Sequence, residues 1–185
     1  MTDPPIPALD LTPEIQTLRD DLRAAFERVL DHQRFILGPE VERFESRAAD
    51  YLGAQHAVGV NSGTDALVIA LRALGVGPGD EVITTPFTFI ATPEAISQVG
   101  ATVVFADIDP LTFNLDPADA QQRLTDRTRA IMPAHLFGRP ADMTALMDLA
   151  EQHDLLVVED AAQAFGATCG GRAAGTIGHA GAYSF

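Results

Sequence analysis

Two adjacent carboxylates follow a short apolar run late in the sequence. Residues 155–159 read Leu-Leu-Val-Val-Glu, and Asp160 comes next. A continuous apolar run with β-branched residues is typical of a strand buried on both faces of a parallel sheet. Asp160 would then lie at the carboxyl end of that strand, where open α/β sheets bind their ligands. The alternative is a helix cap or a structural salt bridge, and this stretch taken alone favours that alternative.

A second group of polar residues, Asn61-Ser62-Gly63-Thr64-Asp65, lies between a predicted strand and a predicted helix. Gly63 would let the backbone approach a ligand closely, and the first N–H groups of the helix favour an anion such as a phosphate. The segment lacks the lysine and the spacing of a nucleoside-triphosphate loop. Ser62 and Thr64 could equally act only as helix caps. The segment therefore predicts either a phosphate cradle or a capped helix.

Two aromatic side chains follow other predicted strands. Phe89 comes after the strand at 81–85, where its ring could stack on a planar ligand, although a lone phenylalanine is more often part of the core. His135 ends the strand at 130–134 and is either an acid–base group or a hydrogen-bonded loop residue. The other histidines do not have the spacing of metal ligands.

These groups share one predicted edge of one sheet. A phosphate cradle, a stacking ring and a buried carboxylate suit a flat, phosphorylated aromatic cofactor that contains nitrogen. Pyridoxal 5'-phosphate fits this description, because the helix N-terminus would hold its phosphate and the carboxylate would keep its pyridine nitrogen protonated.

The elements that must position these groups alternate between strands and helices. Strands are predicted at 57–60, 81–85, 102–106, 130–134, 155–159 and 182–185, with helices at 64–74, 93–99, 117–124 and 142–152. This alternation predicts an α/β fold with three α/β/α layers and a mostly parallel central sheet. Two earlier helices, at 12–31 and 39–52, carry apolar stripes. We expect residues 1–54 to form a helical segment that packs on the large domain or in a dimer interface, and residues 55–185 to form the large domain.

Composition excludes several classes of protein. The net charge of −14 argues against binding to nucleic acid or anionic membranes. No apolar run approaches the length of about 20 residues that crosses a bilayer. The single cysteine, Cys169, permits no internal disulfide and favours a cytoplasmic location. All 12 basic residues are arginine, so no lysine in this chain can form a Schiff base.

A set of motifs, in this order, resembles the amino-terminal half of the DegT/DnrJ/StrS sugar aminotransferases. The matching segments are Phe35 to Val41 with Phe44-Glu45, Asn61 to Leu67, Gly79 to Ile83, Thr88 to Thr92, Gly100-Ala101 leading to Asp107, Glu159 to Gln163, and Tyr183 to Phe185. The resemblance covers residues from about Asp10 to Phe185. It implies the fold of the aspartate aminotransferase large domain (fold type I) and a pyridoxal phosphate cofactor.

The resemblance also implies a role for individual residues. The backbone amides of Gly63 and Thr64 and the hydroxyl of Ser184 match phosphate ligands.

Three further residues match groups that surround the cofactor ring. Phe89 matches the stacking aromatic, Asp160 the partner of the pyridinium nitrogen, and Gln163 the partner of the 3-hydroxyl. The implied reaction moves an amino group, usually from glutamate, to a nucleotide-linked keto sugar, and members of the family are homodimers. The variant Phe35-Ile36-Leu37-Gly38 is similar to members that act on 3-keto sugars.

The sequence departs from the family at one decisive point. The family's Schiff-base lysine lies shortly beyond the position matched by Ser184, and this sequence ends at Phe185. We therefore expect a fragment that contains no catalytic residue, lacks the carboxyl-terminal small domain and is inactive alone. Two alternatives are a sugar dehydratase of the same family, in which histidine replaces the lysine, and a lysine-free homologue that acts as a binding partner. The intact Asp160, Gln163 and Ser184 argue against the second alternative.

Overall fold

The computed structural model describes residues 7–185, so the first six residues of the expected segment 1–54 lie outside it. The described chain divides into two units, residues 7–45 and residues 46–185. In the first unit, α1 (Thr12–His32) begins with Pro13, whose missing N–H costs nothing in the first turn. The side chain of Arg28 in α1 forms a salt bridge of 2.9 Å with Glu40 in the first turn of α2 (Pro39–Leu52). No residue of α1 is buried.

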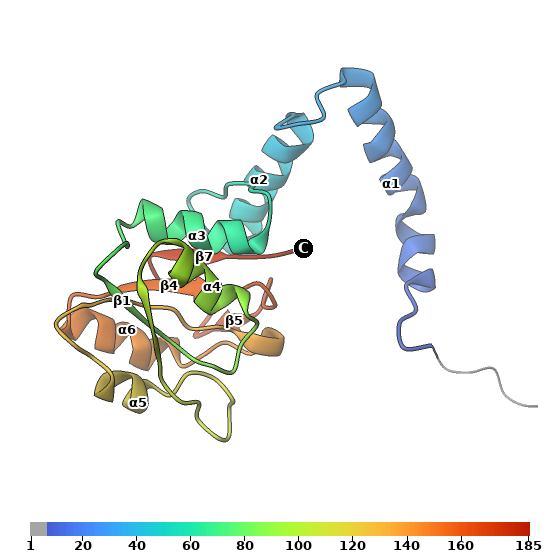
Figure 1. Ribbon diagram of the computed structural model, residues 1–185. Coiled ribbons are helices and arrows are strands. Elements are labelled where there is room, and N and C mark those ends of the chain that lie inside the picture. Colours follow the sequence, from blue (N-terminus) through green and yellow to red (C-terminus); the bar gives the residue numbers. More distant parts are fainter. Residues whose placement is uncertain (1–6) are drawn as a thin grey trace, which may run out of the picture. The chain divides into compact units, whose positions relative to one another are not determined.

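The second unit is built on a five-stranded parallel sheet in the order β2-β1-β3-β4-β7 (Figure 1). Its strands are β1 (Glu81–Thr84), β2 (Thr102–Phe105), β3 (Thr128–Ile131), β4 (Leu156–Asp160) and β7 (Ala180–Ala182). A small antiparallel hairpin of β5 (Thr168–Cys169) and β6 (Arg172–Ala173) lies between β4 and β7 in the sequence. The predicted α/β fold with a mostly parallel sheet is confirmed.

Helices cover both faces of this sheet (Figure 1). On one face, α3 (Gly63–Ala73) and α4 (Ala91–Gln98) pack in a cluster that includes Val82 of β1. On the other face, α5 (Pro117–Gln122) and α6 (Met143–Gln152) pack in a cluster that includes Ile83. Successive strand residues point to opposite faces, so Val82 and Ile83, both fully buried, anchor one layer each.

Three of the predicted strands match the observed ones to within one residue at each end, and the other three differ more. The stretch 57–60 is irregular and forms no strand, and Val58 is 78% exposed. The strand predicted at 130–134 is β3, which ends at Ile131 because Pro133 has no N–H to donate to the ladder. An isolated bridge still places Ala134 beside Asp160. The last strand, β7, ends at Ala182, so residues 183–185 lie beyond it.

We expect Leu146→Ala to lower the free energy of unfolding by about 2–5 kcal/mol, because Leu146 of α6 is fully buried in the second core cluster. Urea unfolding followed by far-ultraviolet circular dichroism measures this loss. Leu111→Ala is the matched control, since Leu111 is 81% exposed, and its effect should stay within about 0.5 kcal/mol. Equal losses in the two variants would contradict the assignment of this core.

Candidate functional site

A cavity of about 390 Å³ opens in the second unit at the carboxyl ends of β1, β3 and β4. This volume lies in the range of small-molecule sites. Its lining includes all six residues that the sequence singles out as cofactor ligands, namely Gly63, Thr64, Phe89, Asp160, Gln163 and Ser184. The structure therefore brings these residues together, while their role as ligands stays a prediction.

The N-terminus of α3 forms one wall of the cavity. Ser62 is the helix cap, and its side chain accepts a hydrogen bond from the Asp65 amide at 3.1 Å, as the capping alternative predicts. This cap leaves the amides of Gly63 and Thr64 as the first donors of the helix, where the helix dipole favours an anion. Both the capping and the phosphate-cradle interpretations therefore fit the same turn.

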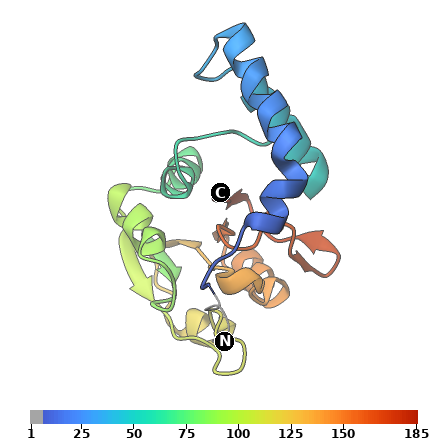
Figure 2. The ribbon, with the colours of Figure 1, turned by 90° about the vertical axis from the view of Figure 1, so that its right-hand side faces the viewer.

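The C-terminal end of the described chain lies beside α3 (Figure 2), and Ser184 approaches Gly63 at the start of this helix. A Cβ atom built on Gly63 would lie 2.8 Å from Cβ of Ser184, closer than real Cβ atoms approach a neighbour, and 3.1 Å from its Oγ. The missing side chain at position 63 therefore lets the side chain of Ser184 lie directly beside the start of α3. A hydroxyl and two helix amides in one wall make a cradle that fits a phosphate group.

Asp160 lies on another wall, at the end of β4, and is only 7% exposed. Its Oδ2 accepts a hydrogen bond of 2.6 Å from the Thr92 hydroxyl, and its Oδ1 accepts one of 3.2 Å from the Ala162 amide. Within residues 7–185 this carboxylate forms no salt bridge. A nearly buried carboxylate that faces a cavity without a cationic partner fits a ligand that brings its own positive charge, such as a protonated ring nitrogen.

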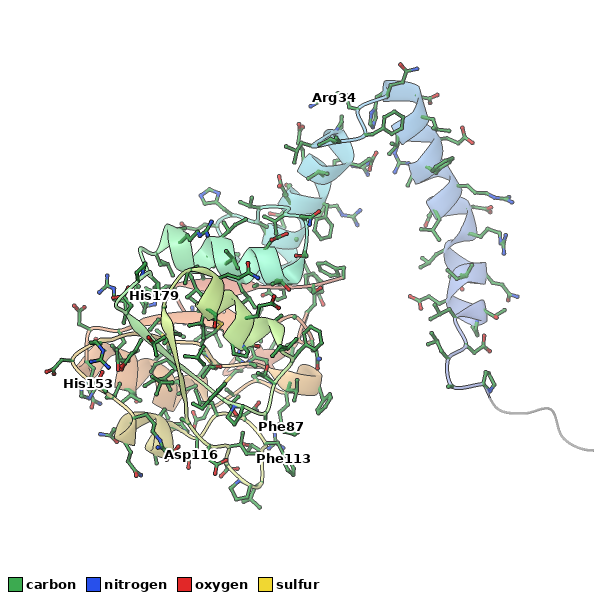
Figure 3. The ribbon with its side chains drawn as sticks, in the orientation of Figure 1. Arg34, Phe87, Phe113, Asp116, His153 and His179 are labelled. Atoms are coloured by element: carbon green, nitrogen blue, oxygen red, sulfur yellow. The ribbon has the colours of Figure 1, made fainter. Side chains whose placement is uncertain are left out.

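Two phenylalanines follow β1, and the structure separates their roles. Phe87 packs against Phe113, with ring centroids 5.9 Å apart (Figure 3). Phe89 lines the cavity and is 66% exposed, so it is not a core residue. An exposed ring at the mouth of a cavity is available to stack on a planar ligand.

Gln163 reaches the cavity with one end of its amide held in place. Its Oε1 accepts a hydrogen bond of 2.8 Å from the amide of Phe137, a residue with a left-handed φ of 56°. The carbonyl end is therefore occupied, and within residues 7–185 the NH₂ end donates no hydrogen bond, which leaves it available to a ligand. A donor at this position suits an anionic or neutral oxygen on a bound ring.

His135 and Glu159 form a buried pair beside the cavity. His135 Nε2 lies 2.9 Å from Glu159 Oε2, and both side chains are fully enclosed. The other ring nitrogen of His135, Nδ1, accepts a hydrogen bond from the Ala141 amide. Nε2 therefore carries the ring hydrogen and donates a hydrogen bond to the carboxylate. With both nitrogens engaged, His135 acts as a structural residue, which agrees with the hydrogen-bonded alternative and not with an acid–base role.

Glu159 also accepts the backbone amides of Gly175, Ile177 and Gly178 at 2.6–2.7 Å. Burial alone would raise the pKa of Glu159, but the bonds from His135, Gly178 and Gly175 outweigh burial and lower it below its usual value. This anion therefore fixes the loop at 175–178 against the end of β4. The sequence analysis assigned no role to Glu159. Because successive strand residues point to opposite faces of the sheet, two adjacent carboxylates on a buried strand could have indicated that each face holds one of them.

The Tyr183 phenol lies in the same region and stays neutral. Burial, with a further contribution from the charge of Glu159, raises the pKa of Tyr183 to about 12. The phenol donates a hydrogen bond to the carbonyl of Ala174, which holds the segment before Ser184 in place.

No group of His, Cys, Asp and Glu within residues 7–185 could hold a metal ion. Of the two histidines labelled in Figure 3, His179 accepts the amide proton of Val157 on its Nδ1, while His153 follows the last turn of α6. No helix in the described part of the chain is long and apolar enough to cross a membrane.

Comparison with known proteins gives a consistent picture. Residues 16–185 match the description "DegT/DnrJ/EryC1/StrS aminotransferase family". The chain is 50% identical over 182 residues to the dTDP-3-amino-3,4,6-trideoxy-alpha-D-glucose transaminase of Streptomyces venezuelae, covering 98% of this chain and 48% of that protein. It is 48% identical over 180 residues to the UDP-N-acetyl-3-dehydro-alpha-D-glucosamine 3-aminotransferase of Acidithiobacillus ferrooxidans, covering 97% and 49%.

A solved structure extends this similarity to the fold. DesV of S. venezuelae, solved in complex with a ketimine intermediate, superimposes with a TM-score of 0.90 at 51% identity, covering 94% of this chain and 47% of that one. The chain spans about half the length of the curated relatives it matches.

We expect Glu159→Gln to lower the free energy of unfolding by about 2–4 kcal/mol at neutral pH, because the new NH₂ group would face N–H donors that now bond to a carboxylate. The native pKa of Glu159 lies below its unfolded value, so the stabilisation is present above the unfolded value of 4.5 and is lost as the pH falls through the native pKa. Urea unfolding between about pH 3 and pH 7 should show the difference between wild type and variant shrinking toward acid.

The exposed Glu151 of α6 provides the control for this experiment. Glu151→Gln should change the free energy of unfolding by less than about 0.5 kcal/mol at each pH. A Glu159→Gln protein as stable as wild type at pH 7 would show that the buried carboxylate does not hold the loop.

Proposed function

The chain belongs to the DegT/DnrJ/EryC1/StrS aminotransferase family, and we propose that the whole protein uses pyridoxal 5'-phosphate to transfer an amino group to a nucleotide-linked keto sugar. One observation carries this proposal. A single cavity gathers a helix N-terminus with an adjacent hydroxyl, an exposed aromatic ring and a nearly buried carboxylate that has no cationic partner among residues 7–185. These three features complement a phosphate, a flat ring and a protonated ring nitrogen.

Each wall of the cavity has one task in this proposal. The amides of Gly63 and Thr64, with the Ser184 hydroxyl, hold the phosphate. Phe89 covers one face of the ring and excludes water from it.

Two polar side chains set the charge of the bound ring. Asp160 keeps a proton on the ring nitrogen, and the free NH₂ of Gln163 donates to the ring's 3-oxygen. When bound, pyridoxal phosphate supplies the electron sink for the amino transfer.

The residue that would hold the cofactor covalently is not among these 185 residues, because the chain contains no lysine. In the proposed reaction, a lysine elsewhere in the whole protein holds the cofactor and moves the proton at the substrate's amine-bearing carbon. This chain supplies the binding and orientation of the cofactor.

The names of two relatives support a more specific acceptor. Both the S. venezuelae transaminase and the A. ferrooxidans aminotransferase are named for an amino group at carbon 3 of a nucleotide-linked sugar. We therefore propose a 3-keto sugar as the acceptor and glutamate as the donor. The nucleotides of the two relatives differ, so the proposal names no nucleotide.

We also propose a homodimer in which residues 1–54 contribute to the interface and residues 55–185 form the cofactor-binding domain. An exposed apolar stripe supports this assignment, with Leu22 at 51% and Phe26 at 62% exposure in α1. A cytoplasmic location completes the proposal and is consistent with the free thiol of Cys169.

We expect Asp160→Asn to weaken the binding of pyridoxamine 5'-phosphate about tenfold or more, because a neutral amide does not offset the charge of the ring nitrogen. Pyridoxamine phosphate is the suitable probe because it needs no lysine. Calorimetric titration measures the dissociation constant, and Asp148→Asn on the exposed side of α6 serves as the control. Equal affinity in wild type and Asp160→Asn would remove this role of Asp160.

We expect the purified 185-residue chain to transfer no amino group from glutamate to a nucleotide-linked 3-keto sugar, since it has no lysine. Chromatography of the nucleotide sugar after incubation with pyridoxal phosphate measures the product. Turnover above the protein-free background would contradict the proposal that this chain only binds the cofactor and that the reaction needs a lysine elsewhere in the whole protein.

A further inference from the structure

A buried threonine touches Asp160 from behind the cavity wall. Thr92, in the first turn of α4, is fully buried and does not line the cavity. Its hydroxyl oxygen lies 2.6 Å from Asp160 Oδ2 and 2.8 Å from the hydroxyl oxygen of Thr88. Thr88 does line the cavity, so the three side chains form a short chain that leaves the cavity and returns to it.

The direction of these hydrogen bonds follows from counting protons. An ionised carboxylate only accepts hydrogen bonds, and a threonine hydroxyl has one proton to donate. The Thr92 hydroxyl therefore donates its hydrogen bond to Asp160, and it can only accept a hydrogen bond from the Thr88 hydroxyl. The chain runs in one direction, from Thr88 through Thr92 to Asp160, and both contacts strengthen in the low dielectric of the interior.

The hydrogen bond from Thr92 restricts rotation of the Asp160 carboxylate. The Ala162 amide holds Oδ1 and the Thr92 hydroxyl holds Oδ2, so the plane of the carboxylate is fixed from two sides. A carboxylate has about four acceptor sites in all, which leaves capacity for a donor in the cavity. Rotation about the Asp160 side chain would break one of the two bonds and leave a buried oxygen without a partner.

We propose that Thr92 is a positioning residue for the cofactor: its hydroxyl, held by Thr88, orients Asp160 so that the carboxylate meets the protonated ring nitrogen. This inference rests on the proposed function. Thr92 does not touch the cofactor or the substrate, and it acts only through Asp160. The contribution of Thr92 to cofactor binding therefore depends on the ring nitrogen.

A pair of ligands that differ only at that atom tests the proposal. Pyridoxamine 5'-phosphate is compared with its 1-deaza analogue, in which a C–H group replaces the ring nitrogen. Calorimetry on the full 185-residue chain gives both dissociation constants, and their ratio measures the preference for the nitrogen. We expect Thr92→Val to reduce this preference about tenfold, whereas Thr92→Ser, which keeps the hydroxyl, should retain it.

The matched control is another buried threonine with a hydrogen bond of the same kind. Thr84 in β1 is fully buried and donates to the carbonyl of Met132 at 2.8 Å, away from the cavity lining. Thr84→Val should cost stability in urea unfolding yet leave the ratio of the two affinities unchanged. If Thr92→Val does not fold, Thr92→Ala removes the same hydroxyl with a better helix former.

Each result has a distinct meaning. A wild-type chain that prefers the nitrogen ligand, together with a Thr92→Val chain that keeps the full preference, would overturn the role of Thr92 and leave the proposed function intact. Loss of affinity for both ligands alike in Thr92→Val would also overturn it, because that pattern indicates a purely structural hydroxyl. A wild-type chain with no preference for the nitrogen ligand would overturn the proposed role of Asp160, and the role of Thr92 with it.

Discussion

The site depends on a single buried anion at the end of β4. Glu159 accepts hydrogen bonds from the His135 ring and from three backbone amides in the loop at 175–178. Without these donors, a carboxylate inside the protein would be strongly unfavourable. With them, it joins the segment after β3, the end of β4 and the loop before β7. Asp160, the next residue along the strand, can then face the cavity from a fixed backbone.

The cavity walls differ in how firmly they are held. Asp160 is fixed by the hydroxyl of Thr92 from the neighbouring helix α4, and the first turn of α3 is closed by its own Ser62 cap. The carbonyl end of Gln163 is fixed by the Phe137 amide. Phe89, by contrast, is largely exposed, and Ser184 lies beyond the last strand. Recognition of the ring's charge therefore rests on a fixed carboxylate. The phosphate cradle combines the capped start of α3 with a residue beyond the last strand, and the covering ring belongs to an accessible segment.

Most of this fold could be predicted from local patterns in the sequence. The parallel sheet follows from regular alternation of strands and helices, and the capped turn at Ser62 follows from residue types that are adjacent in the chain. Strand limits were less predictable. Pro133 follows β3 inside an apolar run, and the stretch 57–60 has the composition of a strand but is irregular in the structure. The bond between Thr92 and Asp160 joins residues 68 positions apart and leaves no local signature.

The close approach of Gly63 and Ser184 has a consequence for how the protein is made. The two halves of the anion cradle are separated in the sequence by every strand of the sheet. On a ribosome, the amides of α3 emerge early, but the hydroxyl that completes their binding site emerges only after β7. Contacts between such distant parts of a chain form late, so this pocket should mature only after the whole sheet has been synthesised.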